Sequence, residues 1–311
     1  MAFKYLVTGG AGFIGSNLVK ELLNRREKVR VLDNFSTGKR ENLLGFKDNP
    51  NFELFEGDLR SFHIVYESVK GVDFILHQGA LPSVPRSIID PITTNEVNIL
   101  GTLNILEAAK NYGVKRVVFA SSSSVYGNNP ELPKRENMQV MPLSPYALSK
   151  YTAERYCQIF YELYGLETVC LRYFNVFGPN QDPNSQYSAV IPKFIKVIKE
   201  NERPVIFGDG KQSRDFTFVS NNVEANILAC TSDKAAGEIF NVACGERYNL
   251  IDLVRQINEV LGKDIEPIYE KERTGDVKHS QADITKIIKL MEFKVNVRFE
   301  EGIAHTVKSM F

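Results

Sequence analysis

Short apolar runs alternate with longer amphipathic stretches through the first 178 residues of the chain. Runs rich in β-branched and aromatic residues predict strands over 4–9, 28–33, 52–58, 72–80, 115–123 and from 167 onward. Apolar positions recur at helical spacing over 13–26, 61–70, 95–113 and 144–165, and a glycine ends each of the last two stretches. This alternation predicts a parallel sheet with helices on both faces.

The pattern changes after Phe177. Residues 178–188 are rich in turn formers and predict a loop, which short helices, short strands and further loops follow. We therefore expect a first domain at 1–176 and a smaller mixed α/β lobe at 177–311, with the chain crossing back around 212–240. Ligands of open parallel sheets bind at the carboxyl ends of the strands, so chemistry is expected in the loops there.

Composition narrows the class of protein. Lysine plus arginine and aspartate plus glutamate each total 38, so the charge balance predicts no nucleic acid partner and no attraction to a membrane. No apolar stretch is long enough to span a bilayer and no leader pattern precedes the first strand, so we expect a cytoplasmic protein. The scattered cysteines predict buried thiols and no metal site; they are Cys157, Cys170, Cys230 and Cys244.

Three evenly spaced glycines follow the first predicted strand. Gly9, Gly12 and Gly15 lie between that strand and the helix that begins near residue 13. Glycine allows a tight turn and the close approach of a pyrophosphate, which the N–H groups of the helix N-terminus can bind. In this context the motif predicts dinucleotide binding on a Rossmann-type, doubly wound sheet.

Two carboxylates end the next two strands. Asp33 can bind the adenosine ribose hydroxyls and would repel a 2′-phosphate, so NAD is expected in place of NADP. Lys39 and Arg40 could serve a phosphate, but a solvated loop explains them more simply. Asp58 has two interpretations, as a partner of the adenine amino group or as the N-cap of the helix over 61–70.

Tyrosine and lysine occur four residues apart twice in the chain. Tyr66 and Lys70 lie on a predicted helix with no polar cluster nearby in sequence, so we expect surface residues. Tyr146 and Lys150 open the helix that follows the serine-rich strand end at 121–124, and residues at this spacing share one helix face. Serine, tyrosine and lysine are therefore expected to converge in one crevice.

That trio suits proton transfer. An ammonium group nearby favours the phenolate, which could remove a proton from a substrate hydroxyl as hydride passes to the cofactor. A serine hydroxyl would orient the same oxygen. A helix capped by Ser144, with Pro145 in its first turn, explains these residues without chemistry, and both interpretations can hold together.

Motifs at strand ends and helix starts run through the whole chain. They are TGGAGFIG (8–15), DN (33–34), GDLR (57–60), SSSSVYG (121–127), SPYALSK (144–150), LRYFNVFGP (171–179) and SRDFTFV (213–219). Together they resemble the extended short-chain dehydrogenase/reductase family, in its NAD-dependent epimerase/dehydratase branch. SVPRSIIDP (83–91), the stretch over 172–195 and GDGKQSRDF (208–216) are similar to UDP-N-acetylglucosamine 4-epimerases.

The resemblance implies a role for each matching residue. Ser122 takes the place of the catalytic serine, Tyr146 that of the base and Lys150 that of its partner. The implied cofactor contacts are Gly9, Gly12, Phe13, Ile14, Gly15, Asp33, Asn34, Ser36, Thr37, Gly38, Asp58, Leu59, Gln78, Ala80, Asn98, Tyr146, Lys150 and Tyr173. The implied substrate contacts are Ser83, Arg86, Ser122, Ser123, Tyr146, Asn175, Ala189, Val190, Lys193, Val205, Phe207, Arg214, Arg273, Asp276 and Ser280.

Three positions depart from patterns known in the family. Pro82 stands where glucose-specific relatives often carry a lysine that helps to hold NAD. Serine stands before the VYG at 125–127, where dehydratases carry aspartate and glutamate, so dehydration is not expected. Ser280 stands where tyrosine restricts the pocket to plain hexoses, and its small side chain leaves room for an N-acetyl group, although one serine in a loop is weak evidence alone.

The resemblance therefore implies reversible inversion at C4 of a UDP-sugar through a 4-keto intermediate, with NAD bound throughout. UDP-GlcNAc and UDP-GalNAc are the expected pair, in which two arginines, Arg214 and Arg273, grip the diphosphate and Asp276 binds the uridine ribose. UDP-glucose or a UDP-uronic acid is the alternative substrate, and a non-catalytic NAD-sensing regulator is a distant alternative. A homodimer through a four-helix bundle of residues 95–111 and 145–164 is also implied, although one chain could cover the same apolar faces.

Overall fold

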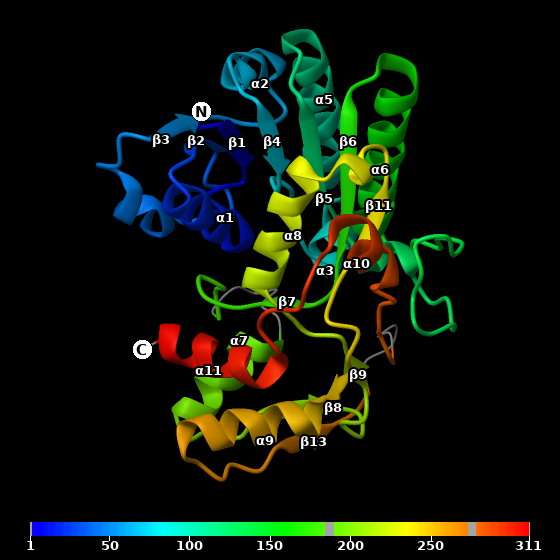
Figure 1. Cartoon of the computed structure of the whole chain (residues 1–311). Helices are drawn as coiled ribbons and strands as arrows, with labels where there is room; N and C mark the ends of the chain where they lie inside the picture. Colours follow the sequence, from blue (N-terminus) through cyan, green and yellow to red (C-terminus); the bar gives the residue numbers. More distant parts are fainter. Residues whose placement is uncertain (1, 184–189, 273–277, 311) are drawn as a thin grey trace.

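Seven strands form one parallel sheet in the computed structural model, which describes residues 2–183, 190–272 and 278–310 (Figure 1). The strands are β1 (Lys4–Thr8), β2 (Lys28–Asp33), β3 (Phe52–Glu56), β4 (Phe74–His77), β5 (Arg116–Ser122), β6 (Glu167–Tyr173) and β11 (Ile239–Val242). Their order across the sheet is β11-β6-β5-β4-β1-β2-β3, and every pairing is parallel. The strand order reverses between β1 and β4, which opens a crevice at their carboxyl ends and confirms the predicted Rossmann-type fold.

Helices cover both faces of the sheet. Because side chains alternate along a strand, Tyr5 and Val7 of β1 join the apolar cluster on one face and Leu6 joins that on the other. The first cluster includes residues of α1 (Phe13–Asn24) and α8 (Val219–Thr231). The second includes residues of α2 (Phe62–Val69), α5 (Gly101–Tyr112) and α6 (Pro145–Tyr164).

The helix predicted over 95–113 begins earlier and is interrupted. Asp90 caps α4 (Pro91–Asn95), accepting a hydrogen bond from the N–H of Thr93 at 3.0 Å. A π-helical turn, η2 (Glu96–Leu100), then leads into α5, which ends at Gly113 with a left-handed φ of 65°. The predicted C-terminus was therefore right, but the apolar spacing did not reveal the π-turn.

The second lobe lies below the carboxyl ends of the strands in the view of Figure 1. It contains α7 (Val190–Lys199), β8 (Val205–Phe207), β9 (Ser213–Arg214), β12 (Tyr248–Asn249), α9 (Leu250–Leu261), β13 (Ile268–Glu270) and α11 (Phe299–Ser309). Strand β8 pairs with β13, β9 pairs with β12, and β7 (Val176–Phe177) pairs with β10 (Thr217–Phe218). The remaining elements are α3 (Val84–Ile89), α10 (Thr285–Met291) and the 3₁₀ turns η1 (Arg40–Phe46), η3 (Ser123–Tyr126) and η4 (Asp233–Ala235).

The chain returns to the sheet after entering the second lobe. Strand β11 pairs with β6, and α8 packs beside α1. The guanidinium of Arg116 donates to the carbonyl oxygens of Ala229 (2.7 Å) and Ser232 (2.8 Å), joining β5 to the end of α8. The division of the chain at residue 176 stays a prediction.

Candidate active site

A glycine loop between β1 and α1 forms one wall of the candidate site. Gly9 has φ +66°, and a Cβ there would lie 2.8 Å from Cα of Gly79, so the turn requires glycine. A Cβ at Gly15 would lie 2.1 Å from the carbonyl oxygen of Gly9. Gly12 is the N-cap of α1 and no side chain caps this helix, so its first N–H groups face outward as an anion cradle. The loop fits the pyrophosphate of a dinucleotide.

A cleft of about 520 Å³ extends from this loop across the carboxyl ends of the sheet. The predicted cofactor contacts that line it are Gly9, Gly12, Phe13, Ile14, Gly15, Asp33, Asn34, Ser36, Thr37, Gly38, Asp58, Leu59, Gln78, Ala80, Tyr146, Lys150 and Tyr173. Sequence reasoning missed several further lining residues, among them Ala11, Asn42, Leu81, Asn180, Gln181 and Asp182. The last three lie in the loop after Phe177, whose turn-rich composition predicted a loop but not its place against the cleft.

Asn98 is the predicted cofactor contact that lies behind the lining. It is 1% exposed on the π-turn η2. Its Oδ1 accepts from the N–H of Leu81 at 2.8 Å, and its Nδ2 donates to the hydroxyl of Ser149 at 3.0 Å. Asn98 therefore joins the lining loop to the turn of α6 that carries Lys150.

Asp33 lines the cleft at the end of β2. Its carboxylate accepts hydrogen bonds from the N–H groups of Ala11 (2.9 Å) and Phe35 (2.8 Å). Burial raises its pKa, while these backbone bonds act against the rise. The carboxylate thus braces the glycine loop, in addition to its predicted contact with an adenosine ribose.

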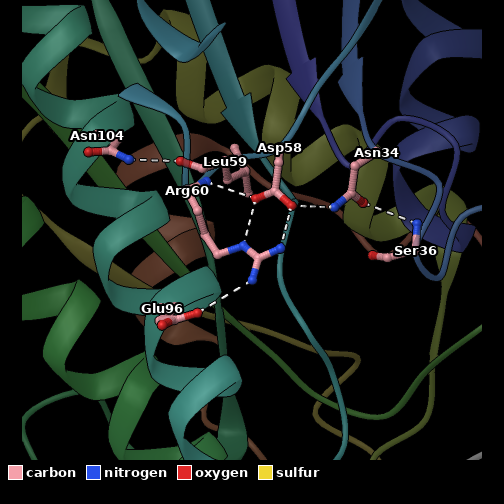
Figure 2. Close-up of polar contacts among 7 residues, drawn as sticks. All are labelled: Asn34, Ser36, Asp58, Leu59, Arg60, Glu96 and Asn104. Carbon is pink, nitrogen blue, oxygen red and sulfur yellow. Dashed lines mark hydrogen bonds and ion pairs between the residues drawn. The ribbon is translucent and has the colours of Figure 1, made fainter. Parts of the chain in front are cut away.

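Asp58 is already saturated with hydrogen bonds (Figure 2). Its Oδ1 accepts from the backbone N–H and Nε of Arg60, and its Oδ2 accepts from Nη2 of Arg60 and Nδ2 of Asn34, all at 2.8–3.0 Å. The bonds from Arg60 lower the pKa of Asp58 to about 2. An adenine amino group could bind Asp58 only if Asn34 or Arg60 gave way. The alternative interpretation as an N-cap is wrong, since Ser61 occupies that position in α2.

The two basic residues after β2 are paired with carboxylates. Nζ of Lys39 lies 3.0 Å from Asp182, and Nη2 of Arg40 lies 2.6 Å from Glu56. Arg40 also lies over the ring of Phe35. These partners favour the simpler interpretation of both residues as surface groups, in agreement with NAD as the cofactor.

Ser122, Tyr146 and Lys150 converge as predicted. Ser144 caps α6, accepting from the N–H of Ala147 at 3.1 Å, and this cap places Tyr146 in the first turn. Tyr146 and Lys150 line the cleft from one face of α6, and the side chain of Ser122 lies near enough to the hydroxyl of Tyr146 to lower its pKa. Both interpretations therefore hold: the capped start of α6 is also the segment that carries Tyr146 and Lys150.

The ammonium of Lys150 is buried where α6 meets β5. It is 4% exposed, and its Nζ donates to the carbonyl oxygen of Ala120 at 2.9 Å. Burial lowers the pKa of Lys150 to about 8, opposed by Cys157 and Glu154. Burial raises the pKa of Tyr146, and the nearby hydroxyl of Ser122 acts against that rise. In this arrangement Tyr146 is a neutral phenol.

The second tyrosine–lysine pair lies on α2, away from the cleft. The ring of Tyr66 packs against Tyr112 of α5 with centroids 4.5 Å apart, and Lys70 is exposed at the end of the helix. The pair is thus part of the packing and surface of a helix, as expected.

Three of the predicted substrate contacts line the cleft, namely Ser83, Arg86 and Tyr146. Others lie on the second lobe, with Val205 and Phe207 on β8 and Val190 and Lys193 on α7. Ser123 begins the 3₁₀ turn η3 directly after Ser122. Ala189, Arg273 and Asp276 lie outside the described residues.

Asn175 and Ser280 meet, although 105 residues separate them. Nδ2 of Asn175 donates to the hydroxyl of Ser280 at 3.3 Å and to the carbonyl oxygen of Asp215 at 3.1 Å. Arg214, beside Asp215 on β9, donates to the carbonyl oxygens of Ser213 and Lys278. The predicted diphosphate contact and the predicted sugar-pocket wall therefore lie on adjoining segments.

The glycine loop gives a direct test of the cofactor cradle. Gly12→Ala is expected to lower the NAD content of the purified protein about tenfold, because the new methyl group narrows the approach to the N-terminus of α1. A Cβ at Gly12 would lie 3.2 Å from the carbonyl oxygen of Gly9, so the fold needs only a small adjustment. Gly45→Ala is the matched control, since a Cβ there meets no atom within 4 Å. The measurement is the amount of NAD released by denaturation, per protein chain. An NAD content equal to that of the wild type in both variants would contradict the cradle.

Comparison with known proteins agrees with the site. The model of the NAD dependent epimerase/dehydratase family matches residues 5–243. A UDP-N-acetylglucosamine 4-epimerase of Methanobrevibacter ruminantium, solved with UDP-N-acetylmuramic acid, superposes with a TM-score of 0.95 at 44% identity, over 100% of this chain and 99% of its own. A UDP-glucose 4-epimerase of Thermus thermophilus, solved with NAD, gives 0.88 at 37% identity, over 99% and 98%. A UDP-glucuronate 4-epimerase of Thermodesulfobacterium geofontis is 37% identical over 97% of this chain and 94% of its own.

The chain belongs to the NAD-dependent epimerase/dehydratase family, as the motifs predicted. Within it, the chain is an NAD-dependent enzyme of the UDP-sugar 4-epimerase group, and NAD is its cofactor. Every helix in the described parts of the chain is too short or too polar to span a bilayer.

Proposed function

We propose that the protein interconverts UDP-GlcNAc and UDP-GalNAc by inversion at C4. The observation that supports this most is Tyr146 in the lining of the cleft with Ser122 next to it, together with the small Ser280 beside Asn175. The same convergence speaks against a non-catalytic NAD sensor, which has no need of a serine and a tyrosine side by side at the cofactor.

The mechanism assigns proton transfer to Tyr146. When bound, NAD supplies the hydride acceptor and donor for C4, and its positive ring favours the phenolate. Tyr146 then takes the proton of the C4 hydroxyl, and it later returns a proton to the C4 oxygen when hydride is delivered to the opposite face of C4. Ser122 holds the C4 oxygen, and Lys150 braces α6 against β5 through the carbonyl of Ala120.

The diphosphate must stay fixed while the 4-keto sugar turns. We assign this role to Arg214 on β9, and Arg273 and Asp276 keep the roles that the resemblance implies. Asn175 lies between Arg214 and the sugar-pocket wall, where its amide can hold the substrate close to Tyr146. UDP-glucose and UDP-glucuronate are the alternative substrates, because relatives of similar identity bear those names.

Product analysis tests the proposal. The purified protein, given no added cofactor, is expected to convert UDP-GlcNAc faster than UDP-glucose, with products separated by anion-exchange chromatography. Conversion of UDP-glucose alone would overturn the proposed specificity. Inactivity on both sugars, even with added NAD, would overturn the proposed pair and leave a UDP-uronic acid as the next substrate to test.

The wall at Ser280 gives a prediction about specificity. Ser280→Tyr is expected to lower kcat/KM for UDP-GlcNAc about 100-fold, because the ring fills the space for the acetamido group. UDP-glucose should lose less than about threefold. Ser280→Ala is the control, since it removes the hydrogen bond from Asn175 without adding bulk. An equal loss of kcat/KM on both UDP-sugars in Ser280→Tyr would show that this wall does not discriminate between substrates.

Exposed apolar side chains support the proposed homodimer. Ile89 (75% exposed) and Ile92 (72%) lie at α3 and α4, and Leu163 (70%) lies on α6. Such side chains are expected to be covered by a second copy through a bundle that includes α5 and α6. Light scattering should then give twice the chain mass of 35.2 kDa. The cytoplasmic location of the protein stays a prediction.

A further inference from the structure

Three polar side chains close a ring of hydrogen bonds at the wall of the cofactor cleft. Nε2 of Gln78 donates to Oδ1 of Asn226 at 3.0 Å, and Nδ2 of Asn226 donates to the hydroxyl of Tyr173 at 2.7 Å. The hydroxyl of Tyr173 donates to Oε1 of Gln78 at 3.2 Å, which completes the ring. Gln78 follows β4, Tyr173 ends β6, and Asn226 comes from α8, so the ring joins three separate elements.

The direction of every bond in the ring is determined. Nδ2 of Asn226 also donates to the carbonyl oxygen of Asn222 at 2.7 Å, and a carbonyl can only accept. Oδ1 of Asn226 must therefore face Gln78, whose Nε2 donates to it. Oε1 of Gln78 is then left to accept the proton of Tyr173. The hydroxyl of Tyr173 thus has its proton and a lone pair both committed.

This matters because two tyrosines line the same cleft. Tyr173 is paired in register with Ser122, which lies next to Tyr146. A second phenol so close could exchange protons with the substrate oxygen. Burial raises the pKa of Tyr173 strongly, and the bonds to Asn226 and Gln78 act only partly against that rise, so Tyr173 stays a neutral phenol whose proton points to Gln78. Asn226 is fully buried, so the ring is screened from water on the α8 side.

We propose that Gln78 and Asn226 are positioning residues that lock Tyr173 as a fixed, neutral wall of the cofactor cleft and so reserve proton transfer for Tyr146. The role in proton transfer rests on the proposed function, whereas the wall concerns NAD binding alone. Breaking any one of the three hydrogen bonds loosens the hold on the side chain of Tyr173 and leaves buried polar groups unpaired. The three residues should therefore act as a unit, with losses that do not add.

The test compares Asn226→Leu, Tyr173→Phe and the double variant. Each single change is expected to weaken NADH binding about tenfold, measured by NADH fluorescence on protein stripped of nucleotide, and to lower kcat by a similar factor. The double variant should bind NADH no more weakly than the weaker-binding single variant. Asn258→Leu on α9 is the matched control. It also removes the amide of a helical asparagine, which hydrogen-bonds with the backbone C=O and N–H of Ile265. It should lower the Tm without changing NADH affinity.

NADH affinity within twofold of the wild type in Asn226→Leu, or losses that add in the double variant, would overturn the proposal. A Tm loss in Asn226→Leu with unchanged NADH affinity would assign the ring to folding alone and would overturn it as well. If the wild-type protein epimerises neither sugar, the proposed function fails, but the NADH titration still decides whether the ring forms the cofactor wall.

Discussion

Tyr146→Phe is expected to lower kcat about 10³-fold, because the phenylalanine ring keeps the packing and loses the one hydroxyl that exchanges the C4 proton. Tyr146 lines the cleft next to Ser122, and the register of β5 and β6 places Tyr173 beside that serine. The committed hydroxyl of Tyr173 cannot replace the missing one. NAD content should match the wild type, since most of the predicted cofactor contacts lie on the glycine loop, at the end of β2 and in the loop that follows β2.

The matched control is Tyr66→Phe, which removes the hydroxyl from the other tyrosine that precedes a lysine by four residues. Tyr66 packs on Tyr112 away from the cleft, so kcat should stay within about twofold. Anion-exchange analysis of products gives kcat for each variant. Turnover of Tyr146→Phe within tenfold of the wild type would show that another group moves the proton.

Arg172→Met is expected to lower the free energy of unfolding by about 3–5 kcal/mol, because it leaves the carboxylate of Glu154 buried without a counter-charge. Nε and Nη2 of Arg172 lie 2.9 and 2.8 Å from the two oxygens of Glu154, and the pair is 2% and 0% exposed. The hydroxyl of Ser121 donates to the same carboxylate, which joins β5, β6 and α6. Urea unfolding of the purified protein measures the loss.

Two further variants separate charge from packing. The double variant Glu154→Gln with Arg172→Met should recover most of the lost stability, because it also removes the carboxylate that Arg172→Met leaves without its arginine. Arg255→Met removes the exposed partner of Asp252 on α9 and should change the free energy of unfolding by less than about 0.5 kcal/mol. A loss in Arg172→Met no larger than in Arg255→Met would contradict the importance of the buried pair.

Much of the fold followed from local patterns. Apolar runs placed the first six strands of the sheet, and Gly113 and Gly165 end α5 and α6 in the left-handed conformation that favours glycine. The glycine loop and Tyr146 with Lys150 could be predicted because each function needs residues close together in sequence. The cap at Ser144 could be predicted for the same reason.

Other features depend on residues far apart in the chain. The ring of Gln78, Tyr173 and Asn226 joins positions up to 148 residues apart, and no local spacing indicates it. The two-residue strands, such as β7 and β10, exist only through their pairing and have no sequence pattern of their own. The N-cap interpretation of Asp58 failed for a local reason: α2 begins at Phe62, so Ser61 holds the N-cap position, and the carboxylate of Asp58 accepts from the N–H of Arg60.

The return of the chain to the sheet limits how the protein can be divided. The N–H groups of Cys170 and Phe174 bond the carbonyl oxygens of Glu238 and Val242, so β11 satisfies the open edge of β6. A fragment ending at residue 176 would leave that edge bare, and a long uncovered parallel strand is a template for aggregation. The two halves are thus not separable modules. Recombination between related enzymes would have to exchange two distant stretches of the chain together to keep this sheet complete. Limited proteolysis should likewise release no stable N-terminal half.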